Sequence, residues 1–258
     1  MSQTVDRAID ILELCGEGPC SLLEITNHLG VHRTTASRLV QTLARRSLLV
    51  RDADGRYVIG VRMAGLAQHA IEHSDLYSVA HPHLVALAED LGYSVHLAVP
   101  VRPYIVSVDI VEPSYSIKMP LRIGARVLVN TSGVGKAILA HLPTSEVEVF
   151  LDNATWQRYT ENTITDREQM KKVLDSVRAR GWAFDDCEYE DISNCIAAPV
   201  HDYRSVVGAV SITAFRAQAD LAALEKHLDR LLATTAAISR GLGWTGRAWA
   251  RLAQAPSA

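Results

Sequence analysis

Apolar and polar positions alternate with helical spacing along the first 46 residues. Apolar residues recur every three or four positions over 5–15, which predicts a first helix. A second helix is expected over 22–29, because Ser21 is followed three residues later by a glutamate, the spacing of a capping box. Gly30 tolerates the left-handed backbone of a sharp turn, and apolar positions resume in a third predicted helix over about 32–46.

After the third predicted helix, apolar residues recur at every second position. Residues 49–51 and 56–59 are predicted to form short strands around Asp54-Gly55, a dipeptide typical of hairpin turns. Three helices, a tight glycine turn and a two-stranded hairpin are together the elements of a winged helix-turn-helix. The sequence therefore predicts such a domain over residues 1–60.

The rest of the chain begins with a helical connector over 61–73 and continues with strands and helices. Period-two and apolar runs predict strands at 93–99, 103–111, 115–119, 182–186, 194–200 and 206–213. Helical spacing predicts helices at 78–91, 133–142, 144–151, 166–180 and 219–241. Hairpin-linked strands mixed with helices favour an antiparallel sheet in an α+β domain.

The expected fold class is therefore multidomain. An N-terminal winged helix-turn-helix, mostly α with a β-wing, precedes a C-terminal α+β domain with an antiparallel sheet. The predicted boundaries are 1–60 for the winged domain, 61–75 for a linker helix, 76–245 for the second domain and 246–258 for a tail.

Composition narrows the setting in which the chain works. The 258 residues carry a formal net charge of -3 at pH 7, so any affinity for nucleic acid must come from local charge. No run of 18 apolar residues and no secretory signal pattern occur, so no membrane association is expected. Cys15, Cys20, Cys187 and Cys195 form no C-x-x-C pair, which fits free thiols in a reducing compartment. We therefore expect a cytoplasmic protein.

The third predicted helix lies in a stretch without acids. No aspartate or glutamate occurs over 32–50, although the chain has 29 acids and 26 bases. In a helix-turn-helix, this helix presents its first side chains to bases in the major groove, where arginine can bind guanine through two hydrogen bonds. A solvated basic helix is the alternative. The predicted DNA-binding residues are Ser21, Arg33, Thr34, Thr35, Ser37 and Arg38, with Arg51 and Arg56 on the hairpin.

Several long segments resemble one known family. VDRAIDILELC and SLLEITNHLGVHRTTASRLVQTLARRSLLVRDADGRYVIG resemble the N-terminal domain of the isocitrate-lyase-regulator (IclR) family of bacterial transcription factors. SGVGKAILAHLP and ITDREQMKKVLDSVRARGWAFDDCEYEDISNCIAAPV resemble later segments of that family, in the same order, over residues 4–240. The sequence departs from the family at His32, where proline is frequent, and at 129–131, where a Pro-Leu-His-type stretch is usual.

The resemblance implies partners and a second site. It implies a GAF-like effector-binding domain and a dimer, or a tetramer formed as a dimer of dimers, on double-stranded operator DNA. The effector-binding residues that it implies are Gly133, Val134, Asp185, Cys195, Ser211 and Thr213. The last two alternate along one strand, so both hydroxyls face one side of the sheet, which suits a small aliphatic or aromatic carboxylate. Plain helix capping at Gly133 and a buried small apolar role for Cys195 are the alternatives.

Two other patterns are weaker. SGVGKA is not a P-loop, because Asn130 and Ala137 stand where that motif needs glycine and Ser or Thr. His69, Glu72 and His73 have H-x-x-E-H spacing, but no convincing third acidic ligand for zinc stands out. No catalytic residue, metal or cofactor is therefore expected.

The expected function is operator binding modulated by a small organic-acid effector. Two alternatives remain at this point. One is a GAF-like enzyme that uses Cys187 or Cys195 in redox or metabolite-processing chemistry. The other is a regulator whose second domain only oligomerises.

Overall fold

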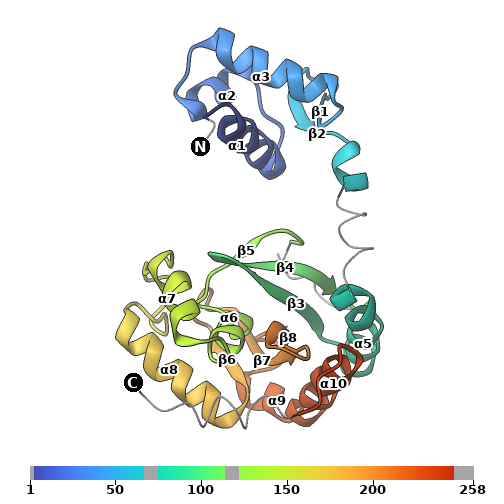
Figure 1. The fold of residues 1–258 in the computed structure, drawn as a ribbon, viewed down its shortest axis with the longest axis vertical. Coiled ribbons are helices and arrows are strands. Elements are labelled where there is room, and N and C mark those ends of the chain that lie inside the picture. Colours follow the sequence, from blue (N-terminus) through green and yellow to red (C-terminus); the bar gives the residue numbers. More distant parts are fainter. Residues whose placement is uncertain (1–2, 67–74, 114–121, 247–258) are drawn as a thin grey trace. The chain divides into compact units, whose positions relative to one another are not determined.

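The computed structural model describes residues 3–66, 75–113 and 122–246 (Figure 1). The chain divides into two compact units, Met1–Ser74 and Asp75–Ala258, and each has its own hydrophobic core. Residues 62–66 are helical, but most of the predicted connector lies outside the described residues. So do the H-x-x-E-H pattern, the predicted strand at 115–119 and nearly all of the predicted tail.

The N-terminal unit contains the three helices and the hairpin that the sequence predicts. Its elements are α1 (Gln3–Glu17), α2 (Leu22–Leu29), α3 (Arg33–Arg45), β1 (Leu49–Arg51) and β2 (Tyr57–Ile59). The two strands are antiparallel, with Val50 opposite Val58. Each of the five elements contributes side chains to one core, including Ile11, Ile25, Val40, Leu49 and Tyr57. The winged helix-turn-helix prediction is confirmed.

The C-terminal unit is built on one antiparallel sheet of six strands in the order β5-β4-β3-β8-β7-β6. The strands are β3 (Ser94–Val101), β4 (Tyr104–Val111), β5 (Arg126–Val127), β6 (Ala183–Asp186), β7 (Ser193–His201) and β8 (Val206–Phe215). The helices are α5 (Asp75–Leu91), α6 (Gly133–Leu139), α7 (Thr144–Asp152), α8 (Arg167–Arg180), α9 (Leu221–Glu225) and α10 (Leu228–Gly241). This arrangement confirms the predicted α+β domain.

Helices cover both faces of this sheet (Figure 1). On one face, α6, α7 and α8 pack against small sheet residues such as Ala98, Ala197 and Ala209. On the other, α5, α9 and α10 pack against larger ones such as Leu97 and Ile212. We call these the α6 face and the α5 face. Because side chains alternate along a strand, neighbouring sheet residues belong to opposite faces.

One predicted element is wrong in detail. The single helix expected over 219–241 is two helices, α9 and α10, separated at Lys226 and His227. No glycine or proline marks this break. Instead the His227 ring packs edge-on against Tyr93, with ring centroids 5.7 Å apart. The break therefore coincides with a tertiary contact and not with a local sequence signal.

No helix in the described part of the chain combines the length and the apolar character needed to cross a membrane.

Candidate DNA-binding surface and effector site

Both ends of α2 are fixed by local features. The amide of Glu24 donates to the Ser21 hydroxyl and the amide of Ser21 donates to the Glu24 carboxylate, at 3.2 and 2.7 Å. These bonds with Ser21, and then Arg56, lower the pKa of Glu24 to about 2. Gly30 closes the helix with φ 59°, the left-handed conformation expected of it. Ser21 therefore has a structural role here, and its predicted phosphate contact stays a prediction.

His32 begins α3 in a way that the sequence reasoning missed. Its Nδ1 accepts from the Thr34 amide at 3.4 Å and lies 3.0 Å from the Thr34 hydroxyl. Histidine is not among the common N-cap residues, so no capping signal is recognisable at this position from the sequence alone. The contact holds the first turn of α3 and orients the hydroxyl of one predicted DNA-binding residue.

The predicted base-reading side chains lie on the outer side of α3. Arg33, Thr34 and Arg38 are exposed, whereas Thr35 and Ser37 are half-buried beside the core residue Ala36. Within the described residues, neither the Arg33 nor the Arg38 guanidinium has a hydrogen-bond or ion-pair partner. Two cations on one helix surface, free of neighbouring acids, can bind phosphate or a guanine edge.

The two arginines of the hairpin are already engaged inside the unit. Arg51 donates to the Tyr57 hydroxyl at 2.5 Å, with its guanidinium 4.8 Å from the ring centroid. Arg56 donates to the carbonyl of Pro19 and forms an ion pair with Glu24 at 2.8 Å. Arg56 thus links the hairpin to the start of α2. Their DNA contacts stay predictions, and for Arg56 such a contact competes with this ion pair.

The strands bring four of the implied effector residues together on the α6 face. In the sheet register, Cys195 on β7 lies opposite Asp185 on β6 and opposite Thr213 on β8. The hydroxyls of Ser211 and Thr213 lie 3.4 Å apart. Cross-strand partners have Cβ atoms about 5 Å apart, so these side chains form one continuous patch.

Helix α6 lies directly against this patch. A Cβ added to Gly133 would lie 2.7 Å from the Cys195 sulfur and 3.1 Å from the Cβ of Ala197, so only glycine allows this approach. The Ser132 hydroxyl accepts from the Gly135 amide at 3.1 Å and caps the helix. Val134 is buried in the core beneath α6. Five implied residues are therefore neighbours in space, and their contact with an effector stays a prediction.

A buried ion pair lies beside Asp185. The Lys136 ammonium lies 2.6 Å from both carboxylate oxygens of Glu188, and both side chains are almost fully buried. Asp185 accepts from the Glu188 amide at 2.7 Å. Burial raises the pKa of Asp185 to about 7, although Lys136 opposes the shift. Neither member of this pair was singled out from the sequence, because 52 residues separate them.

Three further polar side chains of the α6 face were also missed. Ser94 and His96 on β3 lie opposite Thr213 and Ser211 in the register, and Nε2 of His96 lies 2.8 Å from the Ser107 hydroxyl on β4. All three are buried. Strand alternation places positions 94 and 96 on the same face of the sheet, so the sequence did contain a signal for these two residues. An apolar stretch with one serine and one histidine, however, is also typical of an ordinary core strand. We call Ser94, His96, Ser107, Ser211 and Thr213 the polar face.

The cysteine chemistry of the enzyme alternative gains no support. Burial raises the pKa of Cys195 and of Cys187, so both stay thiols near neutral pH, whereas the thiolate is the reactive form. Within the described residues, no three histidine, cysteine, aspartate or glutamate side chains are placed to hold a metal ion.

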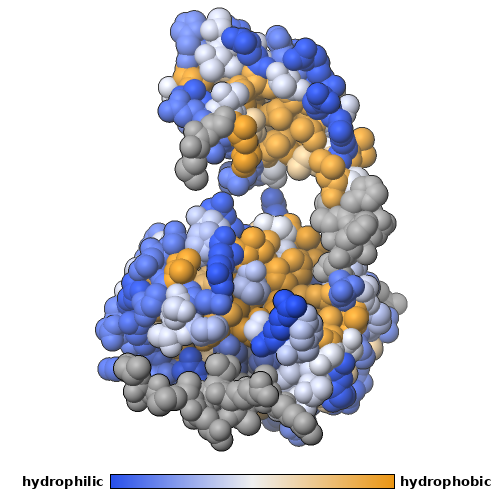
Figure 2. All heavy atoms as spheres, viewed as in Figure 1, coloured by the Kyte–Doolittle hydropathy of each residue, from blue (hydrophilic) through white to orange (hydrophobic). Residues whose placement is uncertain are grey.

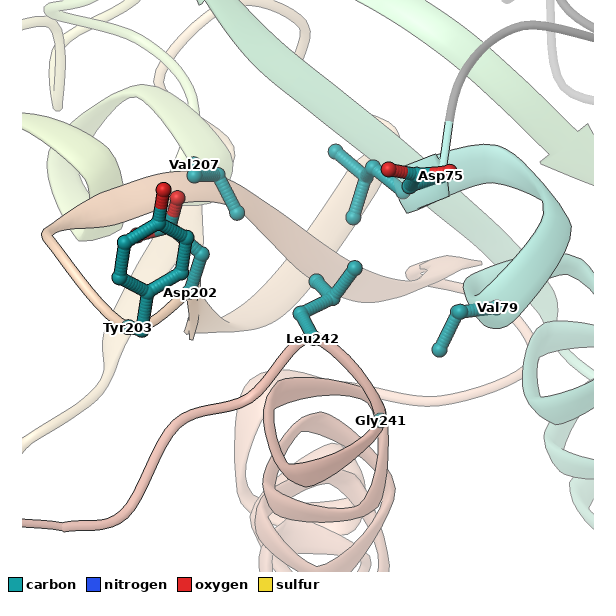
Figure 3. Close-up of a pocket in the computed structure, with 8 residues that line it drawn as sticks. Asp75, Val79, Asp202, Tyr203, Val207, Gly241 and Leu242 are labelled. Atoms are coloured by element: carbon teal, nitrogen blue, oxygen red, sulfur yellow. The ribbon is translucent and has the colours of Figure 1, made fainter.

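A separate cavity of about 410 Å³ lies on the α5 face (Figure 3). Leu76 and Val79 of α5, Val207 of β8 and Leu242 after α10 form its apolar lining. Asp75, Asp202 and Tyr203 line the same cavity. None of the implied effector residues belongs to it, because they point to the opposite side of the sheet.

Comparison with known proteins gives a consistent result over nearly the whole chain. Residues 4–53 match the model of the IclR helix-turn-helix domain, and residues 68–240 match that of the bacterial transcriptional regulator IclR C-terminal domain. The transcriptional regulator RhmR of Escherichia coli (strain K12) is 32% identical over 241 residues, 92% of each chain.

Solved structures agree. The crystal structure of the Thermotoga maritima IclR is 30% identical with a TM-score of 0.74, covering 93% of this chain and 99% of that one. An IclR homolog from Microbacterium hydrocarbonoxydans, solved with 4-hydroxybenzoate, shares the fold at 22% identity and a TM-score of 0.79, with 93% and 99% covered. The resemblance seen in the sequence is confirmed, and the chain belongs to the IclR family of bacterial transcriptional regulators.

Proposed function

We propose that this regulator binds duplex operator DNA as a homodimer, in the cytoplasm, and that a small organic acid bound on the α6 face of its C-terminal unit alters that binding. The observation that carries the proposal is the outer side of α3. Arg33 and Arg38 are exposed there without protein partners in the described chain, and α3 contains no acid. Such a helix suits the major groove, where acids would repel the phosphates.

A binding titration tests the DNA contact. Duplexes selected from a random pool by the full chain are titrated by fluorescence anisotropy at fixed salt. Arg33→Ala and Arg38→Ala should each weaken specific binding about 5- to 150-fold if the side chain reads a base. Arg240→Ala, an exposed arginine on α10, is the matched control with the same loss of charge. Midpoints that stay within twofold for both α3 variants would show that another surface reads the DNA.

Exposed apolar side chains of the N-terminal unit support the dimer. Val5 and Ile9 lie one turn apart on α1 with 56% and 47% exposure, and Val61 and Leu66 are 84% and 51% exposed. Figure 2 shows apolar side chains gathered on the surface of this unit. Apolar surface of this kind is commonly covered by a second subunit. Ile9→Glu should increase the monomer fraction measured by light scattering. An unchanged mass would show that the dimer contact lies elsewhere, or that contacts in the C-terminal unit hold a tetramer together.

The neighbouring effector residues on the α6 face support ligand binding there. A metabolite can alter DNA affinity only if it binds the two DNA-binding geometries differently. We infer that the connector over 61–73 transmits that difference by changing the spacing of the two winged domains. An acid that binds in a calorimetric titration yet leaves operator affinity and DNA geometry unchanged would refute this coupling.

The 4-hydroxybenzoate bound by the Microbacterium hydrocarbonoxydans homolog is a small aromatic carboxylate, one of the two ligand classes, aliphatic or aromatic, expected for this chain from its sequence. A thermal-shift screen of small acids tests the site. Ser211→Ala should reduce the stabilisation by a binding acid. A screen in which no acid stabilises the protein would favour a C-terminal unit that only oligomerises.

A further inference from the structure

The polar face extends beyond the two hydroxyls of β8. His96 lies directly opposite Ser211 and Ser94 lies directly opposite Thr213, so four polar side chains form a block on two adjacent strands. Ser107 on β4 extends this block by one strand through its 2.8 Å contact with His96. Strands are spaced about 4.8 Å apart, so the polar face covers roughly 10 Å across the sheet.

This block is unusual because its hydrogen-bonding capacity exceeds what the protein uses. Ser94 is 3% exposed and His96 is 4% exposed. In the part of the chain that the structure describes, the Ser94 hydroxyl and Nδ1 of His96 have no hydrogen-bond partner. Polar groups in a largely buried setting are normally hydrogen-bonded, so these two atoms are available to a ligand that reaches the α6 face.

The charge state of His96 indicates what kind of group that is. Burial lowers the pKa of His96 to about 4, so the imidazole is neutral at physiological pH. A neutral imidazole offers one donor and one acceptor and gives no counter-charge to a carboxylate. The polar face therefore offers only uncharged groups, each of which can donate or accept. A ligand hydroxyl, which also donates and accepts, is the complementary group.

We propose that His96, Ser107 and Ser94 form a hydroxyl-recognising end of the effector site, and that the effector is a carboxylic acid bearing several hydroxyl groups. In this arrangement the hydroxyls lie over β3 and β4. Ser211 and Thr213 complete the floor on β8. The inference rests on the proposed effector site on the α6 face. It narrows the small aliphatic or aromatic carboxylate expected from the sequence to a polyhydroxylated acid.

Calorimetry on the full-length protein tests this with two panels of acids matched in chain length. One panel contains polyhydroxylated straight-chain acids of three to seven carbons, such as glycerate and gluconate. The other contains unsubstituted acids of the same lengths, such as propionate and hexanoate, together with benzoate. At least one polyhydroxylated acid should bind about tenfold or more tightly than its unsubstituted counterpart, because the latter leaves buried polar groups unpaired.

Two substitutions assign the selectivity to these residues. Ser107→Ala and His96→Leu should each weaken the hydroxylated acid by about two- to tenfold while changing the unsubstituted acid less. Ser176→Ala, an exposed serine on α8, is the matched control. Ser107→Ala removes a single oxygen and so remains informative if His96→Leu folds poorly. A purely structural His96–Ser107 contact would change thermal stability but not the ratio of the two affinities.

The outcomes separate this inference from the proposed site. Unsubstituted acids that bind as tightly as hydroxylated ones, and that depend on Ser211 but not on Ser107 or His96, would overturn this inference and leave the effector site standing. If no acid of either panel binds, the effector site and this inference both fall. Hydroxylated acids that bind selectively, with selectivity lost in Ser107→Ala, support both.

Discussion

The buried pair of Lys136 and Glu188 gives the sharpest energetic prediction. The two side chains are 1% and 6% exposed, and the ammonium contacts both carboxylate oxygens at 2.6 Å. Desolvating two charges costs several kcal/mol per ion, which their attraction only partly offsets. Burial raises the pKa of Glu188 even though Lys136 opposes the shift, so desolvation is the larger effect here as well.

Removing one charge should therefore cost far more than removing both. Lys136→Met or Glu188→Leu leaves the other charge buried without its partner, and each should lower the free energy of unfolding by about 3–5 kcal/mol. The double variant has no buried charge and keeps most of the side-chain volume, so we expect it to lie within about 1 kcal/mol of the wild type. The resulting coupling energy is roughly 5 kcal/mol or more, well above the 0.5–3 kcal/mol common for neighbouring residues.

Urea unfolding followed by tryptophan fluorescence measures this directly. Trp156, Trp182, Trp244 and Trp249 all lie in the C-terminal unit, so the signal reports that unit in the intact protein. A slope of about 1–3 kcal/mol per molar converts the expected single-variant loss to a midpoint shift of more than about 1 M. If the losses of the single variants simply added in the double variant, the pair would not be coupled and the reasoning would be wrong.

Three further predictions concern other positions. Gly133→Ala should destabilise the C-terminal unit by about 1–3 kcal/mol in the same assay, because the new Cβ would lie 2.7 Å from the Cys195 sulfur. Adding Cys195→Ala to this variant should restore part of the lost stability. An unchanged urea midpoint in Gly133→Ala would contradict the close approach. Burial lowers the pKa of His201 to about 4, so stability is lost as pH falls below about 6.5, where the unfolded histidine takes up a proton that the folded one does not. Between pH 7 and pH 5 the wild type should lose about 2 kcal/mol more than His201→Phe, and equal losses would show that the folded histidine also titrates. Ser21→Ala should destabilise the N-terminal unit by about 1 kcal/mol in thermal melts followed by circular dichroism, since it removes the α2 cap, and unchanged hydrogen exchange in α2 would exclude a stabilising cap.

The N-terminal unit could be predicted almost completely because its signals are local. The bounds of α2 agree with the prediction at both ends, since Ser21 and Gly30 mark them chemically. Helix α3 and both strands lie within one residue of their predicted bounds. The engagement of Arg56 was not foreseen, because its partner Glu24 lies 32 residues away and no local pattern pairs them.

The candidate effector site could be predicted only in part. The resemblance supplied residues such as Asp185 and Cys195, and strand alternation put Ser211 and Thr213 on one face. The sequence could not supply the register that sets His96 opposite Ser211, because β3 and β8 are more than 100 residues apart. Nor did any local signal separate α9 from α10, whose break carries neither glycine nor proline.

The two faces of the sheet differ in a way that bears on function. On the α5 face, two buried polar side chains have protein partners: Asp109 bonds to His81 at 2.7 Å, and Asn194 donates to the Ala219 carbonyl. On the α6 face, Asp185 is held with a raised pKa, and the polar face keeps hydrogen-bonding capacity that the described residues do not use. A domain that served only to oligomerise would be more stable with apolar side chains at those positions. The largely buried polar groups that the register brings together, and that keep unused hydrogen-bonding capacity, lie on this one face, which argues that it is retained for a ligand.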